Sequence, residues 1–402
     1  MKKLFMCLCL GACVLAGAAT AADLYRVDLD SYDHARVLRE SGVQPVVRLD
    51  NAYLILGETA QIKTLTLAGI HAEQLATNLS SAELALDSRR DSGNRHRFPV
   101  LFEHDDLRLL RVSPDEIGAA ELQYDLIPLR TELLTFEYRP PFDPGALGKK
   151  LAALPDGLDT LIQRIEQDSL VTYLERLQAF NGRLAGSDSN YASRDWIAGK
   201  FTEFGYDSLV IDSFYHDFGS GMTSCQNVVA YKPGSVYPDH HIVVGAHRDA
   251  VMYSPGADDN GSGTVAVMEI ARALAGVETE ITIVFVLFDA EEFGLYGSWE
   301  YAARAYANRD NIVCMLNMDM IGYLENDHET TVYHGPDLTI PNLYNELADS
   351  LTSITGHLAG TSAYSDHYPF QQLGWPVVFV IEWEFSSVYH TYRDSTSYIN
   401  YD

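Results

Sequence analysis

The stretch HIVVGAHRDAVMYSPGADDNGSGTVAVMEIARALAGVETEITIVFVLFDAEEFG, residues 241–294, decides the fold of this chain. It contains two nearly continuous apolar runs, 241–247 and 281–288, separated by a run with helical spacing over 261–276. A strand that is apolar throughout, instead of at every second residue, indicates a strand buried on both faces of its sheet. Two such strands joined through a helix predict a parallel β–α–β unit.

The same alternation continues on both sides of this unit. Further apolar runs predict strands, and runs with helical periodicity predict helices between them. We therefore expect an α/β fold with a mostly parallel central sheet, flanked by helices on both faces. The additional strands are expected at 227–232, 311–318 and 376–382, and the additional helices at 158–180, 192–206, 297–310 and 340–356.

The first part of the chain has a different pattern of expected strands and helices. Its strands and helices are expected in the order βαββαβ, which suits a small split sandwich. A second stretch rich in β-formers follows, over 98–113 and 120–130. The sequence thus predicts a small α+β N-terminal domain before the main sheet. The strands of the first motif are expected at 24–29, 44–49, 52–58 and 71–76, and its helices at 31–41 and 60–69.

Length and composition suggest four segments. The 402 residues exceed one ordinary domain, and an apolar content of 47% supports packed cores over disorder. Residues 1–22 begin with two lysines and continue as an apolar run with small residues at its end, which predicts a signal peptide. The N-terminal domain then covers 23–138, a linker rich in proline covers 139–156, and the main domain covers 157–402.

A signal peptide implies export, to the periplasm or to the medium. Its apolar run is too short for a comfortable span, and no other segment is apolar enough, so we expect no membrane span in the mature chain. The net charge of −28 disfavours binding to nucleic acid or anionic membranes. Two cysteines remain after the signal, Cys225 and Cys314, either as one disulfide or as two buried thiols. The oligomeric state is left open.

Histidines and carboxylates follow the carboxyl ends of the expected strands. In open α/β sheets, ligand sites form at this edge of the sheet. Five separate places deliver such residues, which is hard to explain as a coincidence of solvated loops. They are His247 and Asp249 after the first strand, Asp258 and Asp259 before its helix, Glu291 and Glu292 after 281–288, Asp319 after 311–318, and His390 beyond 376–382.

The residue types point to a pair of divalent cations. Imidazole and carboxylate ligands suit zinc, and also cobalt or manganese. One carboxylate can bridge two ions, and water between two dications loses its proton near neutral pH. Asp249 lies two residues after His247, on the same side of an extended segment, so it can orient that imidazole. Glu291 and Glu292 are neighbours and point differently, so one can bind metal while the other holds the water.

Six motifs resemble those of the zinc aminopeptidases of the M28 type, over about residues 157–402. They are HRD (247–249), GADDNGSG (256–263), DAEEFGLYGS (289–298), LNMDMIG (316–322), YSDHYPF (364–370) and YHTYRD (389–394). Each motif alone would be weak, but together and in this order they are very specific. The resemblance implies a metallopeptidase that hydrolyses terminal peptide bonds, most readily at the amino end of peptides with a free terminus, and the predicted signal peptide implies that it is exported.

The resemblance also implies residue roles. One zinc would be held by His247, Asp259 and Asp319, and the other by Glu292, Asp259 and His390, with Asp259 bridging both. Glu291 would be the general base, and the peptide bond after Asp259 would be cis. Tyr389 resembles the tyrosine that in some members donates a hydrogen bond to the developing oxyanion. Cobalt or manganese can replace zinc in such a site.

Some alternatives stay open at this stage. The same site can serve a carboxypeptidase or a dipeptidase, and a related fold with one zinc is found in glutaminyl cyclases. Arg248 stands where the family more usually has a neutral or aromatic residue, and we expect its side chain to point away from the metals. Asp366 and His367 are interpreted as structural. Tyr364, Trp383 and Phe385 are candidates for lining a substrate pocket.

The N-terminal domain is not explained by these motifs. Because it precedes an exported peptidase, we interpret it as a pro-region or chaperone that covers the cleft until it is removed.

Overall fold

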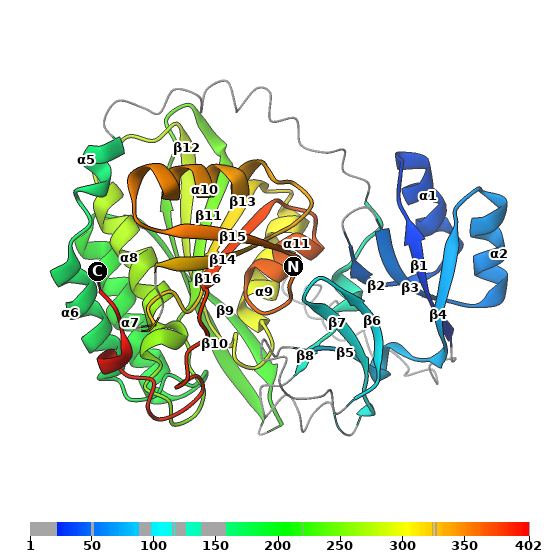
Figure 1. The fold of residues 1–402 in the computed structure, drawn as a ribbon, viewed down its shortest axis with the longest axis horizontal. Coiled ribbons are helices and arrows are strands. Elements are labelled where there is room, and N and C mark those ends of the chain that lie inside the picture. The colour runs from blue at the N-terminus through cyan, green and yellow to red at the C-terminus, as the bar shows by residue number, and fades with distance from the viewer. Residues whose placement is uncertain are drawn as a thin grey trace, which may run out of the picture.

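The computed structural model describes residues 22–49, 52–87, 98–114, 116, 126–137, 158–219, 221–323, 325 and 328–401. The predicted linker at 139–156 and all of the predicted signal peptide except Ala22 lie outside these ranges. Within them, no helix is both long enough and apolar enough to cross a bilayer. A large unit built on one wide sheet and a smaller β-rich unit lie side by side (Figure 1).

The wide sheet has eight strands. They are β9 (Ser208–Asp217), β10 (Met222–Lys232), β11 (Tyr237–His247), β12 (Ile281–Phe288), β13 (Asn311–Met318), β14 (Glu329–His334), β15 (Thr355–Gly360) and β16 (Val377–Glu382). Their order is β15-β14-β16-β13-β11-β12-β10-β9. The central strands β16, β13, β11 and β12 are parallel, as expected, whereas β9, β10 and β14 join their neighbours towards the centre in antiparallel pairs. The sheet is therefore mixed, with a parallel centre.

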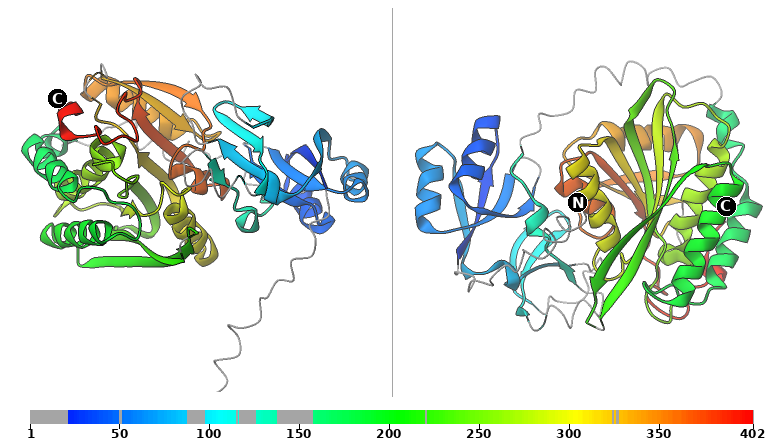
Figure 2. Two further views of the ribbon diagram at one scale, coloured as in Figure 1. Left: turned by 90° about the horizontal axis from the view of Figure 1, so that it is seen from below. Right: turned by 180° about the vertical axis from the view of Figure 1, so that it is seen from behind.

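Helices cover both faces of this sheet (Figure 2). Side chains alternate along each strand, so neighbouring residues of one strand belong to different cores. Val228 and Ala230 pack with α6 (Gln167–Gln178), α7 (Asp188–Glu203) and α8 (Gly263–Leu274). Val229 packs on the other face, with α9 (Tyr296–Asn308) and α11 (His367–Gln372). The short helix α5 (Leu158–Ile162) precedes α6, and α10 (Thr339–Leu351) packs on β14 and β16.

The N-terminal unit consists of two small sheets. The first contains β1 (Ala22–Asp28), β2 (Gln44–Arg48), β3 (Ala52–Gly57) and β4 (Ala72–Leu79), in the order β2-β3-β1-β4. Its helices α1 (Tyr32–Ser41) and α2 (Thr59–Leu67) lie on one face (Figure 1). The second contains β5 (Leu84–Asp87), β6 (Val100–His104), β7 (Leu107–Arg111) and β8 (Leu126–Pro128), in the order β6-β7-β5-β8. The βαββαβ order predicted for the first motif is present.

Local sequence explains the ends of these elements. Helix α1 begins after Ser31, whose side-chain oxygen accepts a hydrogen bond from the main-chain N–H of His34 at 3.2 Å. It ends at Gly42, whose φ of 73° suits glycine at a helix C-terminus. The run predicted as one helix at 158–180 instead forms α5 and α6, with a short break between them.

One hydrophobic core joins the N-terminal unit to the main sheet. Leu86, Leu107 and Ile127 of the second small sheet belong to the same buried cluster as Trp299 of α9 and Phe370 of α11. The N-terminal unit therefore lies over the face of the large sheet that carries α9 and α11 (Figure 2). Separating the two units would expose buried apolar surface on both, at a cost of roughly 25 cal/mol per Å².

Candidate metal centre

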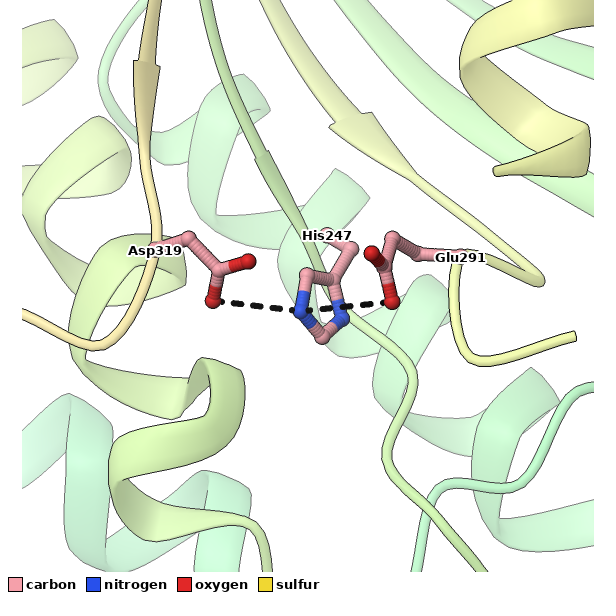
Figure 3. Close-up of side chains that lie close together, drawn as sticks. All are labelled: His247, Glu291 and Asp319. Atoms are coloured by element: carbon pink, nitrogen blue, oxygen red, sulfur yellow. Dashed lines mark ion pairs between the residues drawn. The ribbon is translucent and has the colours of Figure 1, made fainter. Parts of the chain in front are cut away.

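Three strand ends bring charged side chains together around His247. Its Nε2 atom lies 3.3 Å from Oδ1 of Asp319, which follows β13, and 3.8 Å from Oε2 of Glu291, which follows β12 (Figure 3). The same Nε2 atom lies 3.3 Å from Oδ1 of Asp259. These residues come from the carboxyl ends of adjacent parallel strands and from the loop before α8, where ligand sites form in open α/β sheets.

A second group of ligand atoms shares Asp259. Nε2 of His390 lies 3.0 Å from Oδ2 of Asp259 and 3.1 Å from Oε2 of Glu292. One oxygen of Asp259 thus faces His247 and the other faces His390. A carboxylate placed between two imidazoles in this way fits a position that bridges two cations. The peptide bond between Asp259 and Asn260 is cis, as the resemblance implied.

The chemistry of the cluster fits divalent cations. His247 is only 1% exposed, yet five carboxylates lie within 3.8 Å of its ring nitrogens or those of its neighbour His390. Oδ1 of Asp319 is buried without a hydrogen-bond donor, which is costly for a carboxylate unless a cation contacts it. Potential ligand atoms of His247, Glu291 and Asp319, and of His247, Asp259 and Glu292, lie within 4.8 Å of one another. These donors match zinc.

The pKa values of the cluster without cations also show that these buried carboxylates are unfavourably crowded. Burial, together with neighbouring carboxylates such as Asp366, raises the pKa of Glu291 well above its ordinary value. Burial and the charge of Asp259 raise the pKa of Glu292 to about 7. Burial alone would lower the pKa of His390, but Glu292 and Asp259 raise it to about 10. Cations would replace protons as the neutralising charge.

Asp249 connects the two motifs that supply these ligands. Its Oδ1 and Oδ2 atoms accept hydrogen bonds from the main-chain N–H groups of Glu291 at 3.2 Å and Glu292 at 3.3 Å. Oδ1 also lies 3.5 Å from Nδ1 of His247. One carboxylate therefore faces the second ring nitrogen of a ligand and holds the loop of the two glutamates. This geometry supports the predicted orienting role.

Arg248 points away from the cluster, as expected, and is fully buried elsewhere. Its guanidinium forms an ion pair of 2.7 Å with Asp289 and donates to the carbonyl oxygens of Gln226 and Asn190. Asp289 in turn accepts from the main-chain N–H of Gln226 at 2.7 Å. Arg248 and Asp249 thus attach the HRD segment to the DAEE segment at two separate points.

The loop that carries Asp259 is held by residues that the sequence analysis did not assign. Asp394 accepts hydrogen bonds from the main-chain N–H groups of Asp258 and Asp259 at 2.8 and 3.1 Å. Arg183, also fully buried, donates to the carbonyl oxygens of Arg248, Pro255 and Gly256. Asp394 was visible in the YHTYRD motif, but nothing in the sequence around Arg183 signalled this contact.

Ser365 is another residue that sequence reasoning missed. Its hydroxyl donates to Oδ2 of Asp319 at 2.6 Å and accepts from Asn317 at 2.8 Å. The following residues, Asp366 and His367, are fully buried. His367 faces the carbonyl oxygen of Ser362 at 3.2 Å and stacks on Phe379, which fits the structural interpretation. Asp366 lies close enough to Glu291 to raise the pKa of that carboxyl, so its charge is felt in the cluster.

Two of the three aromatic candidates lie beside the cluster. The ring of Tyr389 stacks on His390 with 3.7 Å between ring centroids, and Phe385 packs against Tyr389. Tyr364 belongs to the same hydrophobic cluster. Trp383 instead is 43% exposed and packs against His357. Burial and nearby carboxylates raise the pKa of Tyr389 well above its ordinary value, so its hydroxyl keeps a proton to donate.

Comparisons with known proteins give the class to which this fold and cluster correspond, the zinc-dependent hydrolases of the exopeptidase type. Residues 227–402 match the model of Peptidase family M28. The chain is 28% identical over 293 residues to leucine aminopeptidase 1 of Penicillium rubens, a match that covers 64% of this chain and 72% of that protein.

Solved structures show the same fold at low sequence identity. The Legionella pneumophila LapA aminopeptidase superposes with a TM-score of 0.61 at 20% identity, over 79% of this chain and 92% of that one. A zinc aminopeptidase from Bacillus subtilis superposes with a TM-score of 0.52 at 18% identity, over 59% of this chain and 91% of that one. The remaining part of this chain is thus an addition to the fold that the Bacillus enzyme represents.

Proposed function

We propose that this chain is an aminopeptidase that binds two zinc ions and releases the N-terminal residue of peptides. The observation that carries the proposal is the position of Asp259, with one oxygen facing His247 and the other facing His390. His247, Asp259 and Asp319 would hold one ion, and His390, Asp259 and Glu292 the other. The names of the curated relatives support aminopeptidase action over the carboxypeptidase, dipeptidase and cyclase alternatives.

The bound zinc ions would polarise the scissile carbonyl and lower the pKa of the attacking water. The residues of the chain do the remaining work. Glu291 takes the proton of that water and passes it to the leaving amine, for which its position beside His247 is suited. Asp249 holds His247 and the glutamate loop in place. Tyr389 donates a hydrogen bond to the carbonyl oxygen as negative charge develops there.

The test combines metal analysis with a substrate panel. We expect about two zinc ions per chain, and release of free N-terminal residues from aminoacyl amides that stops with a chelator. N-acetylated peptides should be inert. Glu291→Gln should keep its zinc and lose activity by a factor on the order of 10² to 10⁴. Loss of zinc in this variant would instead make Glu291 a ligand.

Other outcomes of the same panel would replace the proposal. Release from the carboxyl end, cleavage of dipeptides alone, or cyclisation of an N-terminal glutamine peptide would each assign a different reaction to this site. Zinc binding followed by no turnover on any of these substrates would remove the exopeptidase proposal.

Export and the domain boundaries also belong to this proposal. Residues 1–22 would direct the chain to the periplasm or the medium and be removed after Ala21 or Ala22. Expression of the full chain in a bacterium, followed by fractionation and N-terminal sequencing, tests both points. A cytoplasmic protein that retains Lys2 and Lys3 would contradict them. The same sequencing shows whether the N-terminal domain, residues 23–138, stays attached to the active enzyme or is removed as a pro-region.

A further inference from the structure

The turn between β6 and β7 of the N-terminal unit contacts the segment that follows β15. The main-chain N–H of Asp106 donates to the carbonyl oxygen of Thr361 at 3.2 Å, and the N–H of Thr361 donates to Oδ2 of Asp105 at 3.0 Å. Gly360 has a φ of +75°, and a Cβ atom there would lie 2.5 Å from Asp105. The approach is therefore close, and it depends on a glycine at that position.

Two side chains of the same hairpin, Asp106 and Arg108, lie against tyrosines of the large unit. Oδ2 of Asp106 accepts a hydrogen bond of 2.8 Å from Tyr333. Arg108, on β7, pairs with Glu103 of its own hairpin at 2.9 Å. Burial raises the pKa of the Tyr364 phenol, and Arg108 lies close enough to that phenol to lower the pKa by a smaller amount. Tyr333 is only 2% exposed, and a buried phenol needs a partner for its O–H group. The N-terminal unit supplies that partner, so it completes the hydrogen bonding of a buried residue in the other unit.

Both tyrosines belong to an apolar cluster that adjoins the metal centre. The rings of Tyr333 and Tyr364 meet edge to face, with 5.9 Å between centroids. The cluster also contains Met320, which follows Asp319 in the chain, and Tyr389, which stacks on His390. Tyr364, Phe385 and Tyr389 are only partly buried, so the cluster presents an apolar surface beside the predicted ligands.

The segment that contains Tyr364 also supports a predicted ligand directly. Ser365, its neighbour, donates to Asp319 at 2.6 Å. The hairpin on one side and Asp319 on the other therefore hold the segment 360–365 between them.

The N-terminal unit that carries the hairpin is held in place at other points of the interface. The side-chain amide of Gln372 pairs with the main chain of Arg48, accepting from its N–H at 2.7 Å and donating to its carbonyl oxygen at 2.9 Å. Thr135 and Tyr306 join their hydroxyls at 2.8 Å across the same interface. With the shared hydrophobic core, these contacts fix the position of the N-terminal unit before any substrate binds.

We propose that the hairpin 100–111 determines specificity, because Asp106 and Arg108 position the buried Tyr333 and the partly exposed Tyr364, and Tyr364 then contacts the substrate's terminal side chain. The class of side chain that fits this apolar surface is large and apolar, aliphatic or aromatic. Asp106 and Arg108 act through Tyr333 and Tyr364 and are positioning residues. This inference rests on the proposed function and gives the N-terminal unit a role in the active enzyme.

The test compares substrates within each variant. Arg108→Met and Asp106→Ala should lower kcat/KM for leucyl and phenylalanyl amides by about tenfold, mainly through KM, and for alanyl amide by less than about twofold. Zinc content should stay unchanged. Arg111→Met is the matched control on the same strand, because Arg111 contacts only Asn78 and Glu83 of its own unit among the bonds resolved for it. Asp106→Asn keeps an oxygen acceptor for Tyr333 and should recover the leucyl-to-alanyl ratio.

An equal loss on all substrates, or no change in the leucyl-to-alanyl ratio, would overturn the inference and leave the hairpin with a structural role. A readout without turnover separates this result from failure of the proposed function. Zinc-loaded Glu291→Gln protein is titrated with free leucine and free alanine by calorimetry, with and without Arg108→Met. The protein that also carries Arg108→Met should bind leucine more weakly than Glu291→Gln alone, and it should bind alanine equally well. A shift confined to leucine supports the hairpin even if no peptide substrate is turned over, and equal binding contradicts it.

Discussion

Arg248 and Asp289 form an ion pair of 2.7 Å in which neither side chain is exposed to solvent. Arg248 directly precedes Asp249 in the segment after β11, and Asp289 lies two residues before Glu291 in the segment after β12. A buried charge that loses its partner is strongly destabilising, whereas an exposed pair contributes little. This pair therefore stabilises the junction between two strand ends that both contribute to the site.

Replacement of Arg248 tests this contribution. Arg248→Met leaves the carboxylate of Asp289 buried and without its cation, so we expect the free energy of unfolding to fall by about 3–5 kcal/mol. Arg36→Met, which removes an exposed ion pair with Asp33, should cost less than about 1 kcal/mol. Urea denaturation of the zinc-free proteins measures both values. Equal losses in the free energy of unfolding for the two variants would show that the buried pair stabilises the fold no more than the exposed pair does.

Asp249→Asn tests the support of the metal ligands. The amide cannot accept from both glutamate N–H groups as the carboxylate does, and it no longer favours the ligating form of His247. We expect zinc affinity to fall by about 10- to 100-fold. Competition with a chromophoric chelator measures the affinity without any turnover. Asp239→Asn, on the exposed part of β11, is the control and should bind zinc like the parent. An unchanged affinity in Asp249→Asn would disprove the orienting role.

His367 makes stability depend on pH. Burial lowers its pKa to about 3, whereas an unfolded histidine titrates near about 6.5. Below pH 6.5 the unfolded chain binds a proton that the folded chain does not, so stability falls as the pH falls towards 3. At pH 5 this difference amounts to about 2 kcal/mol.

The measurement is a comparison with His367→Gln, which keeps an N–H donor for the carbonyl oxygen of Ser362. Between pH 7.5 and pH 5, the parent should lose about 2 kcal/mol more than the variant in zinc-free denaturation experiments. Other titrating groups are common to both proteins and cancel in the difference. Parallel pH profiles for parent and variant would mean that His367 is not held neutral by the fold.

The two cysteines of the described chain are free and buried. Burial raises the pKa of Cys314 to about 12 and that of Cys225 further, so neither forms the reactive thiolate near neutral pH. In protein that begins near residue 23, iodoacetamide should leave both unmodified in the native state and alkylate both in guanidinium. Leu67→Cys, at a position that is 82% exposed, should react at once. A disulfide between Cys225 and Cys314 in the purified protein would contradict this prediction.

The reach of sequence reasoning differs from strand to strand. The runs 281–288 and 311–318 match β12 and β13 residue for residue, because strands buried on both faces must be apolar throughout. β9 lies at the edge of the sheet, with Val210 and Tyr215 largely exposed, and was not predicted. β14 and β15 were missed as well. β15 forms the other edge of the sheet, where no continuous apolar run is needed, and β14 beside it has the sequence ETTVYH, in which only Val332 and Tyr333 are apolar. The short helix α11 begins within the YSDHYPF motif and extends two residues beyond it, and this segment was interpreted only as a motif.

The sequence by itself determined which residues gather at the metal centre. Parallel strands end at a common edge, so residues just after an apolar run must meet there, and His247, Asp259, Glu291, Glu292 and Asp319 do so with His390. Only the tertiary structure decided which contacts hold them. The bonds of Asp394 to the Asp259 loop and of Ser365 to Asp319 join segments far apart in the chain, and no local periodicity encodes such pairs.

The position of the N-terminal unit was likewise decided by packing alone. Leu107 and Trp299 share one core because two apolar surfaces bury more area together than apart, and many apolar patterns would satisfy that requirement equally well. The hydrogen bond of Asp106 to Tyr333 follows from that docking, and neither residue carries a signal of it in the sequence.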